Sequence, residues 1–139
     1  MQNISSQVHT TDVVPTYGIN CAHTCVSTII EEWYGLGSYT KENTNLTADG
    51  GLEMLERKYK NTWRKHFSSK QAKVLSRIKN TIKNIKKLSQ ISGKSFETVV
   101  QHLVVFLADN HRHNLSAIAD DIRDNLDKIV STLNQPLIN

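Results

Sequence analysis

Several features are missing from this 139-residue sequence, and each absence excludes a class of protein. It has no run of 18 apolar residues, so no membrane-spanning helix is expected. Residues 1–16 lack a charged stretch followed by an apolar one, so no secretion signal is predicted. The only cysteines, Cys21 and Cys25, lie four residues apart on a predicted helix, which favours reduced thiols in an intracellular protein. Strand-like alternation and internal repeats are also lacking, which leaves an all-α fold.

Acidic residues are absent from residues 57–87, and this basic segment dominates the charge pattern. It holds twelve of the seventeen Lys and Arg residues and none of the thirteen Asp and Glu residues, although the whole chain carries only +4. Apolar residues recur through it at core-like spacing: Tyr59, Trp63, Phe67, Leu75, Ile78, Ile82 and Ile85. Basic residues on an ordered amphipathic frame indicate a nucleic-acid-binding surface. The simpler interpretations are a solvated helix face or a nuclear-import signal.

The apolar periodicity predicts one domain with five helices, over about residues 19–34, 50–60, 70–90, 96–108 and 115–133. The expected N-caps are Asn20, Asp49, Ser68 or Ser69, and Ser95. Residues 1–18 are predicted as a flexible lead-in, 19–91 as a DNA-binding core and 92–139 as a C-terminal helical hairpin. The predicted fold class is therefore all-α, with a helix-turn-helix (Myb- or homeodomain-like) three-helix core and a C-terminal helical extension.

The predicted helix over residues 70–90 has two distinct faces. One side is apolar and suits a core: Val74, Leu75, Ile78, Ile82 and Ile85. The opposite side is polar and basic: Lys73, Ser76, Arg77, Asn80, Lys83, Asn84 and Lys87. Because the major groove of duplex DNA accepts one α-helix that presents Arg, Lys and Asn, this polar side is the predicted DNA-reading face.

The order of landmarks around the basic segment resembles a known family. It is the C-terminal DNA-binding domain of the yeast glycolytic-gene activator and of its relatives among fungal osmostress and filamentous-growth activators. The landmarks cover about residues 26–88: Glu32-Trp33, Gly35-Leu36, Leu55-Glu56, Tyr59, Trp63-Arg64, and Ser76-Arg77 with Lys79 and Ile82. Two features depart from the family pattern, because Ile78 stands where a second arginine is usual and the 37–50 loop is long. Residues 93–139 have no counterpart in the pattern.

The resemblance implies a nuclear protein that binds short duplex sites in fungal promoters. For the glycolytic-gene activator these sites are CT-box elements with a CTTCC core. It also implies that the protein works beside other promoter-bound transcription factors. Four residues are carried over by matching: Trp63, Arg64, Arg77 and Lys79.

The candidate DNA contacts follow from the polar face and from the resemblance. The predicted base contacts are Arg77, Asn80, Lys73, Ser76 and Asn84, since Arg pairs well with guanine and Asn with adenine. The predicted phosphate contacts are Arg64, Lys65, His66, Ser69, Lys70, Lys79, Lys83 and Lys87, several of them near a helix N-terminus, which favours phosphate. Trp63 is predicted to be a core residue that anchors the 61–69 loop onto the 70–90 helix.

The cysteines and histidines suggest two other functions. A Cys-x-x-x-Cys pair on a helix, with the distant His102, His111 and His113, does not match a compact zinc pattern. Asn20-Cys21 at a predicted helix start would suit a thiol nucleophile with a later histidine as base, but no glycine-rich approach and no strands accompany it. No metal, no cofactor and no enzymatic activity are therefore predicted, and both cysteines are interpreted as half-buried helix residues.

Double-stranded DNA is the predicted partner, and no membrane partner is expected. The 96–108 helix is apolar nearly all round, which suits either a brace for the DNA-binding part or a homodimer interface. The alternative function is a protein-interaction or RNA-binding helical module that uses the same basic face. RNA more often needs exposed aromatic side chains for stacking, and only Tyr59, Trp63 and Phe67 lie nearby.

Overall fold

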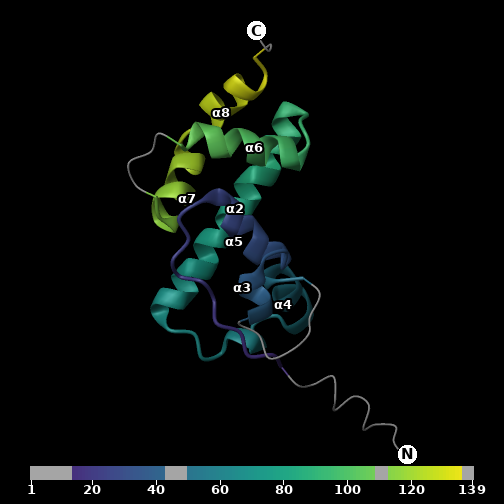
Figure 1. Cartoon of the computed structure of the whole chain (residues 1–139), viewed down its shortest axis with the longest axis vertical. Helices are drawn as coiled ribbons and strands as arrows, with labels where there is room; N and C mark the ends of the chain where they lie inside the picture. The colour runs from purple at the N-terminus through teal and green to yellow at the C-terminus, as the bar shows by residue number, and fades with distance from the viewer. Residues whose placement is uncertain (1–13, 43–49, 109–112, 136–139) are drawn as a thin grey trace, which may run out of the picture.

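The computed structural model describes residues 14–42, 50–108 and 113–135, and its elements in these ranges are all helices (Figure 1). They are α2 (Val26–Tyr34), α3 (Ser38–Glu42), α4 (Leu52–Tyr59), the 3-10 helix η1 (Thr62–Arg64), α5 (Ser69–Ser92), α6 (Phe96–Phe106), α7 (Leu115–Asp124) and α8 (Leu126–Leu133). The all-α prediction is confirmed.

The α5 helix is the spine on which α2, α6, α7 and α8 pack. Its 24 residues make a continuous rod of about 36 Å. Ser68 closes a capping box at the start, in which its hydroxyl accepts from the Gln71 amide and the Gln71 side chain accepts from the Ser68 amide. Gly93 ends the helix in the left-handed conformation, with φ of 74°. Local signals therefore define α5, and the helix predicted over 70–90 is confirmed.

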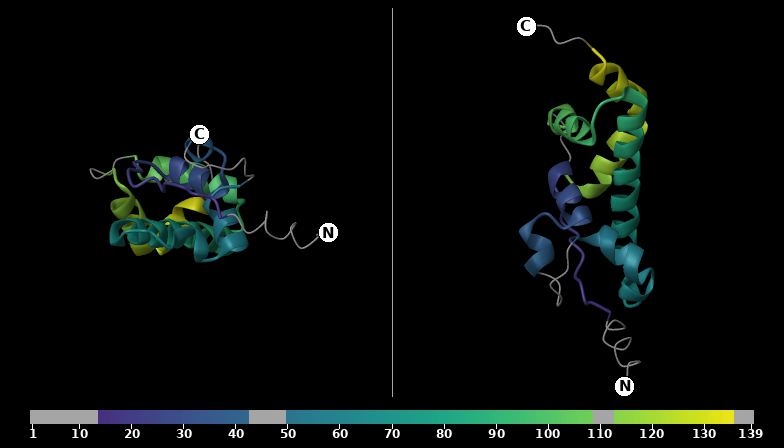
Figure 2. Two further views of the ribbon diagram at one scale, coloured as in Figure 1. Left: turned by 90° about the horizontal axis from the view of Figure 1, so that it is seen from below. Right: turned by 90° about the vertical axis from the view of Figure 1, so that its right-hand side faces the viewer.

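One face of α5 is buried from Val74 to Leu88. The buried apolar residues are Val74, Leu75, Ile78, Ile82, Ile85 and Leu88. The helices α2, α6, α7 and α8 pack against α5, and the right-hand view of Figure 2 shows it standing at one edge of the molecule. One hydrophobic core runs from Tyr17 to Leu133. The division into a DNA-binding core and a C-terminal hairpin stays a prediction.

The first helix begins later than the sequence predicts. Its N-cap is Cys25, and the Asn20 side chain instead accepts from the Ala22 amide. The preceding segment is held extended by Glu32, whose buried carboxylate accepts from the Tyr17 hydroxyl at 2.5 Å and from the Asn20 amide at 2.9 Å. The His23 ring pairs with the same carboxylate. A buried carboxylate needs such partners, and the extended segment supplies them, so the predicted cap Asn20 is wrong.

The same carboxylate perturbs the tyrosine beside it. Burial, reinforced by the neighbouring Glu32, raises the pKa of the Tyr17 phenol far above its usual range. The raised pKa keeps the phenol protonated at neutral pH, where it donates its hydrogen bond to Glu32. This contact fixes the segment that leads into α2.

The long helix predicted over 115–133 is two helices. Asn125 separates α7 from α8, and its side-chain amide donates to the backbone carbonyl of Asp121 at 2.7 Å. An Asn side chain that bonds to local backbone competes with the helix, which explains the break. The predicted cap Ser95 is confirmed, because its hydroxyl accepts from the Thr98 amide. The predicted cap Asp49 lies outside the described residues, and the N-cap of α4 is Gly51.

The connection between α4 and α5 bears on the helix-turn-helix prediction. Residues 60–68 separate the two helices and include η1, whereas helix-turn-helix units use a turn of roughly three or four residues. The α4 helix packs on α2 and on η1. The fold is all-helical, and the specific three-helix core stays a prediction.

Candidate nucleic-acid interface

The outward face of α5 presents polar and basic side chains to solvent. Lys73, Ser76, Arg77 and Asn80 are exposed, and Asn84 is half-buried. On the same helix Lys70, Lys83 and Lys87 are also exposed. The unbroken helix therefore brings all five predicted base contacts onto one rod, and four of the five are exposed.

A second group of predicted contacts lies at the start of α5. Lys65, His66 and Ser69 are exposed between η1 and the first turn of the helix. Trp63 is buried at 6 % exposure beneath them. Its ring packs edge-on against Phe67, with centroids 5.1 Å apart, and against Tyr17 at 6.3 Å. The prediction that Trp63 is a core residue is confirmed.

Two predicted phosphate contacts are engaged within the protein. Glu56 accepts from the Trp63 indole at 2.6 Å and from Arg64 Nε at 2.7 Å, and it also pairs with the Lys79 ammonium group. Burial favours the neutral acid, but the hydrogen bonds from Arg64, Lys79 and Trp63 outweigh it and lower the pKa of Glu56 below its usual value. Glu56 therefore ties η1 and α4 to the middle of α5. Sequence reasoning missed this role, although Glu56 is the acidic residue that directly precedes the basic segment.

Two grooves run along the sides of α5. The α2–α5 groove has a volume of about 710 Å³ and is lined by Trp33, Lys79, Ile82, Lys83, Lys86, Lys87 and Gln90. The α5–α7 groove has a volume of about 500 Å³ and is lined by Cys21, Lys70, Lys73, Val74, Arg77, Asn114, Leu115 and Ser116. Lys86, Trp33 and the start of α7 were not predicted as site residues. The positive charge of Lys86 was a signal from which it could have been predicted as a site residue. The positions of Trp33 and of the start of α7 depend on packing between helices that are distant in the sequence.

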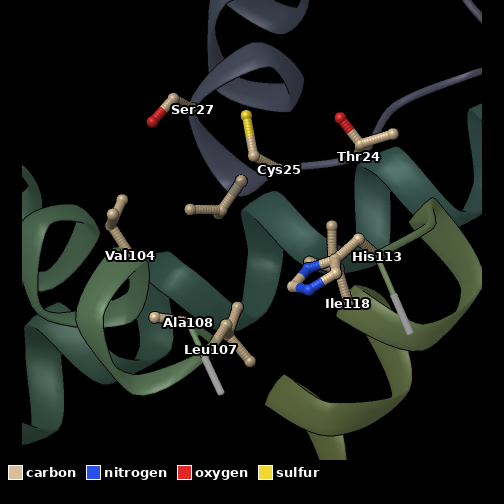
Figure 3. Close-up of a pocket in the computed structure, with 9 residues that line it drawn as sticks. Thr24, Cys25, Ser27, Val104, Leu107, Ala108, His113 and Ile118 are labelled. Atoms are coloured by element: carbon tan, nitrogen blue, oxygen red, sulfur yellow. The ribbon is translucent and has the colours of Figure 1, made fainter. Parts of the chain in front are cut away.

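The cysteines and histidines that the structure describes do not gather into one metal site. Cys25 and His113 line an apolar cavity of about 250 Å³, in which the Cys25 sulfur points away from the His113 ring (Figure 3). His102 bonds Thr132, and His111 lies outside the described residues. Within the described ranges no group of three or more His, Cys, Asp or Glu residues is placed to hold a metal ion.

The alternative of a thiol nucleophile assumes that a helix starts at Cys21, whereas the N-cap of α2 is Cys25. Cys21 precedes α2 by several residues and contacts the Ile19 carbonyl, so Asn20-Cys21 does not begin a helix. Cys25 occupies the N-cap and is exposed.

Among the described helices, none is long and apolar enough to cross a bilayer.

Comparison with known proteins places this arrangement in a family. A family model described as "Transcriptional activator of glycolytic enzymes" matches residues 17–106. No curated protein and no solved structure matches the chain. The match extends beyond the 26–88 range of the resemblance at both ends, so the expectation that residues after 92 have no counterpart is wrong for α6. Because the match covers more than half of the sequence and includes all of α5, the chain belongs to the family of transcriptional activators of glycolytic enzymes, which is not an enzyme class.

Proposed function

We propose that this chain is the DNA-binding part of a transcriptional activator and that it recognises a specific duplex sequence with α5. The observation that carries the proposal is the continuous exposure of the polar face of α5 over Lys73, Arg77, Asn80 and Lys83. An α-helix of this kind fits the major groove. In this proposal α2 braces α5, and α4 is tied to α5 through Glu56 and Lys79, as the supporting helices of a helix-turn-helix-like unit with a long connection. The proposed site of action is the nucleus. The target implied by the family is a promoter element of the CT-box type with a CTTCC core.

The roles within the face follow from position around the helix. At about 100° per residue, Ser76 and Asn80 lie opposite the buried Ile78, so they are the proposed central base contacts. Lys73, Arg77 and Asn84 lie along one shoulder of the helix. Arg64 and Lys79 support the interface through Glu56. The remaining cations and polar groups at the helix start and on its outer turns are proposed to contact phosphate: Lys65, His66, Ser69, Lys70, Lys83 and Lys87.

Affinity measurements on two duplexes test this proposal. One duplex carries the CTTCC element and the other a scrambled version of it. Asn80→Ala is expected to weaken binding to the element by ~1–3 kcal/mol and to relax preference at one base position. Lys83→Ala is expected to weaken both duplexes alike, because phosphates carry no sequence information. Equal losses on both duplexes for Asn80→Ala would remove Asn80 from the set of base contacts.

The alternative of RNA binding meets a structural difficulty. Single-stranded RNA is usually held by exposed aromatic rings, whereas Trp63 is buried and Tyr59 and Phe67 are half-buried. A mobility-shift competition between the labelled duplex and unlabelled RNA, duplex DNA or an acidic protein separates the candidates. Displacement by duplex DNA alone is the expected result. Stronger displacement by RNA or by the acidic protein would overturn the proposed function.

A further inference from the structure

We infer that the two basic grooves beside α5 seat the phosphate backbones of the two strands that border one major groove of the bound duplex. This inference rests on the proposed function and deepens it. It adds contacts outside the predicted DNA-reading face of α5, at Lys86 and at the start of α7. It also assigns Lys73 and Arg77, predicted from the sequence as base contacts, to one backbone.

The α2–α5 groove combines free cations with an unmet donor. Lys83, Lys86 and Lys87 are exposed, and no acidic partner pairs with them within the described residues. Trp33 is only 9 % exposed, and its indole nitrogen has no hydrogen-bond acceptor in the described part of the chain. Leaving a buried donor unpaired costs about 1–3 kcal/mol. The Trp33 nitrogen is itself shielded from the groove, so the groove favours an anion through its lysines, to which a phosphate group supplies the missing counter-ion.

The α5–α7 groove has cations on one wall and a helix start on the other. Lys70, Lys73 and Arg77 come from α5, and no acidic side chain lines the groove. Across from them α7 begins, where Asn114 accepts from the amides of Ala117 and Ile118. The backbone amides of Leu115 and Ser116 lie between Asn114 and Ala117, in the first turn of α7, where N–H groups have no intrahelical acceptor. Cations and a positive helix end on facing walls favour an anion between them.

The spacing of the two grooves matches a duplex. At about 100° per residue, Lys70, Lys73 and Arg77 lie on the side of α5 opposite Lys79, Lys83 and Lys86, and the groups are centred roughly 15 Å apart along the axis. A major groove is about 12 Å wide, and an α-helix with side chains is about 10–12 Å across. A helix lying obliquely in the groove therefore meets one strand near its first turns and the other near its later turns. Ser76 and Asn80 then lie between the backbones and face the bases.

Paired protein and DNA modifications test the assignment of strands. Lys70→Ala/Lys73→Ala and Lys83→Ala/Lys86→Ala each remove two charges from one groove, and Lys94→Ala/Lys128→Ala removes two exposed charges elsewhere as the matched control. Each groove variant is expected to weaken binding roughly tenfold and to reduce the slope of log affinity against log salt by about two. The control is expected to change neither. Circular dichroism checks that all three variants keep the helical fold.

Neutral methylphosphonate linkages placed in one strand at a time identify the strand that each groove contacts. Linkages in one strand that weaken binding of the wild-type chain should not weaken binding of Lys70→Ala/Lys73→Ala any further. Linkages in the other strand should likewise not weaken binding of Lys83→Ala/Lys86→Ala any further. If both variants lose sensitivity to the same strand, or if both behave like the control, the inference is overturned while duplex binding itself stands. A wild-type chain that binds no duplex overturns the proposed function as well.

The contribution of α7 can be separated from its packing. Ser116→Asp places a carboxylate in the first turn of α7, where it favours the helix dipole but repels a phosphate in the α5–α7 groove. The expected result is unchanged or higher thermal stability with weaker binding to both duplexes. Thr98→Asp makes the same change in the first turn of α6, away from the groove, and should leave affinity unchanged. Equal affinities for the two variants would remove α7 from the interface.

Discussion

At the scale of single residues, Glu56 shows how the basic segment tolerates its own charge. The segment contains no acid, so the carboxylate that neutralises part of it comes from α4. Glu56 has a side-chain exposure of 14 %, which makes its contacts with Arg64 and Lys79 stronger than those of a surface pair. Two of the predicted phosphate contacts are thereby held in place, and the outer cations remain available.

Glu56→Gln is expected to lower the free energy of unfolding by about 1–2 kcal/mol at pH 7, because charged hydrogen bonds to Arg64 and Lys79 are lost. The folded protein holds the pKa of Glu56 below its usual value of about 4.3, so this contribution is fully present above that value. It is lost as the pH falls through the lowered pKa. Denaturant unfolding at a series of pH values should therefore show the unfolding free energies of the wild type and of Glu56→Gln converging in acid.

Glu53→Gln is the matched control for that experiment. Glu53 pairs with Arg57 one turn apart at 3.4 Å, and both side chains are well exposed. Pairs of this kind contribute about 0.3–0.5 kcal/mol. Two outcomes would contradict the role given to Glu56. One is a loss of unfolding free energy for Glu53→Gln as large as that for Glu56→Gln, and the other is a stability difference between the wild type and Glu56→Gln that stays constant into acid.

At the scale of elements, the accuracy of sequence reasoning depends on how local the determining contacts are. The boundaries of α5 follow from Ser68, Gly93 and an apolar stripe, all of which can be read within the helix itself. The start of α2 depends on Glu32, which binds groups up to fifteen residues away. The sequence shows the glutamate but not its burial, so sequence periodicity predicts helix where the chain is extended.

The same distinction applies to the candidate interface. The outward side chains of α5 were predictable because a helical wheel fixes which residues oppose the core. The engagement of Lys79 by Glu56 and the two grooves were not, since each requires knowing which helices lie beside α5. Sequence alone thus predicts the charges of the candidate interface, whereas packing decides which of them are free.

The two serines at the start of α5 allow stability and binding to be tested separately. Ser68→Ala removes the capping box and is expected to cost about 1 kcal/mol of unfolding free energy. Ser69→Ala lies one residue later, at the first helical position, and should leave stability within about 0.5 kcal/mol. Thermal unfolding of both variants checks this. Since Ser69 is a proposed phosphate contact, Ser69→Ala should instead weaken duplex binding, and a reversed pattern would assign the cap to Ser69.

At the scale of the whole molecule, the family match and the hydrophobic core have different limits. The match ends at residue 106, whereas buried residues of α7 and α8 complete the cover of α5: Leu115, Ile118, Ile122, Ile129 and Leu133. Val104 and Val105 on α6 are 45 % and 73 % exposed. Homodimerisation through this helix remains a prediction, while the bracing of α5 by α7 and α8 is visible in the packing.

A chain that ends at residue 108 is therefore expected to lose cooperative folding, although it contains the entire family match. Ile118, Ile122 and Ile129 are at most 3 % exposed, and burying each contributes about 1.5–3 kcal/mol. Their sum is comparable with the whole stability of a domain, which is about 5–15 kcal/mol. In the full chain, Ile122→Ala should cost about 2–5 kcal/mol, whereas Ile91→Ala, at 56 % exposure, should cost almost nothing. Thermal unfolding monitored by circular dichroism tests the shortened chain, Ile122→Ala and Ile91→Ala. If the shortened chain unfolds cooperatively near the temperature of the full one, α5 is stable without its brace, and α7 and α8 form a separate unit.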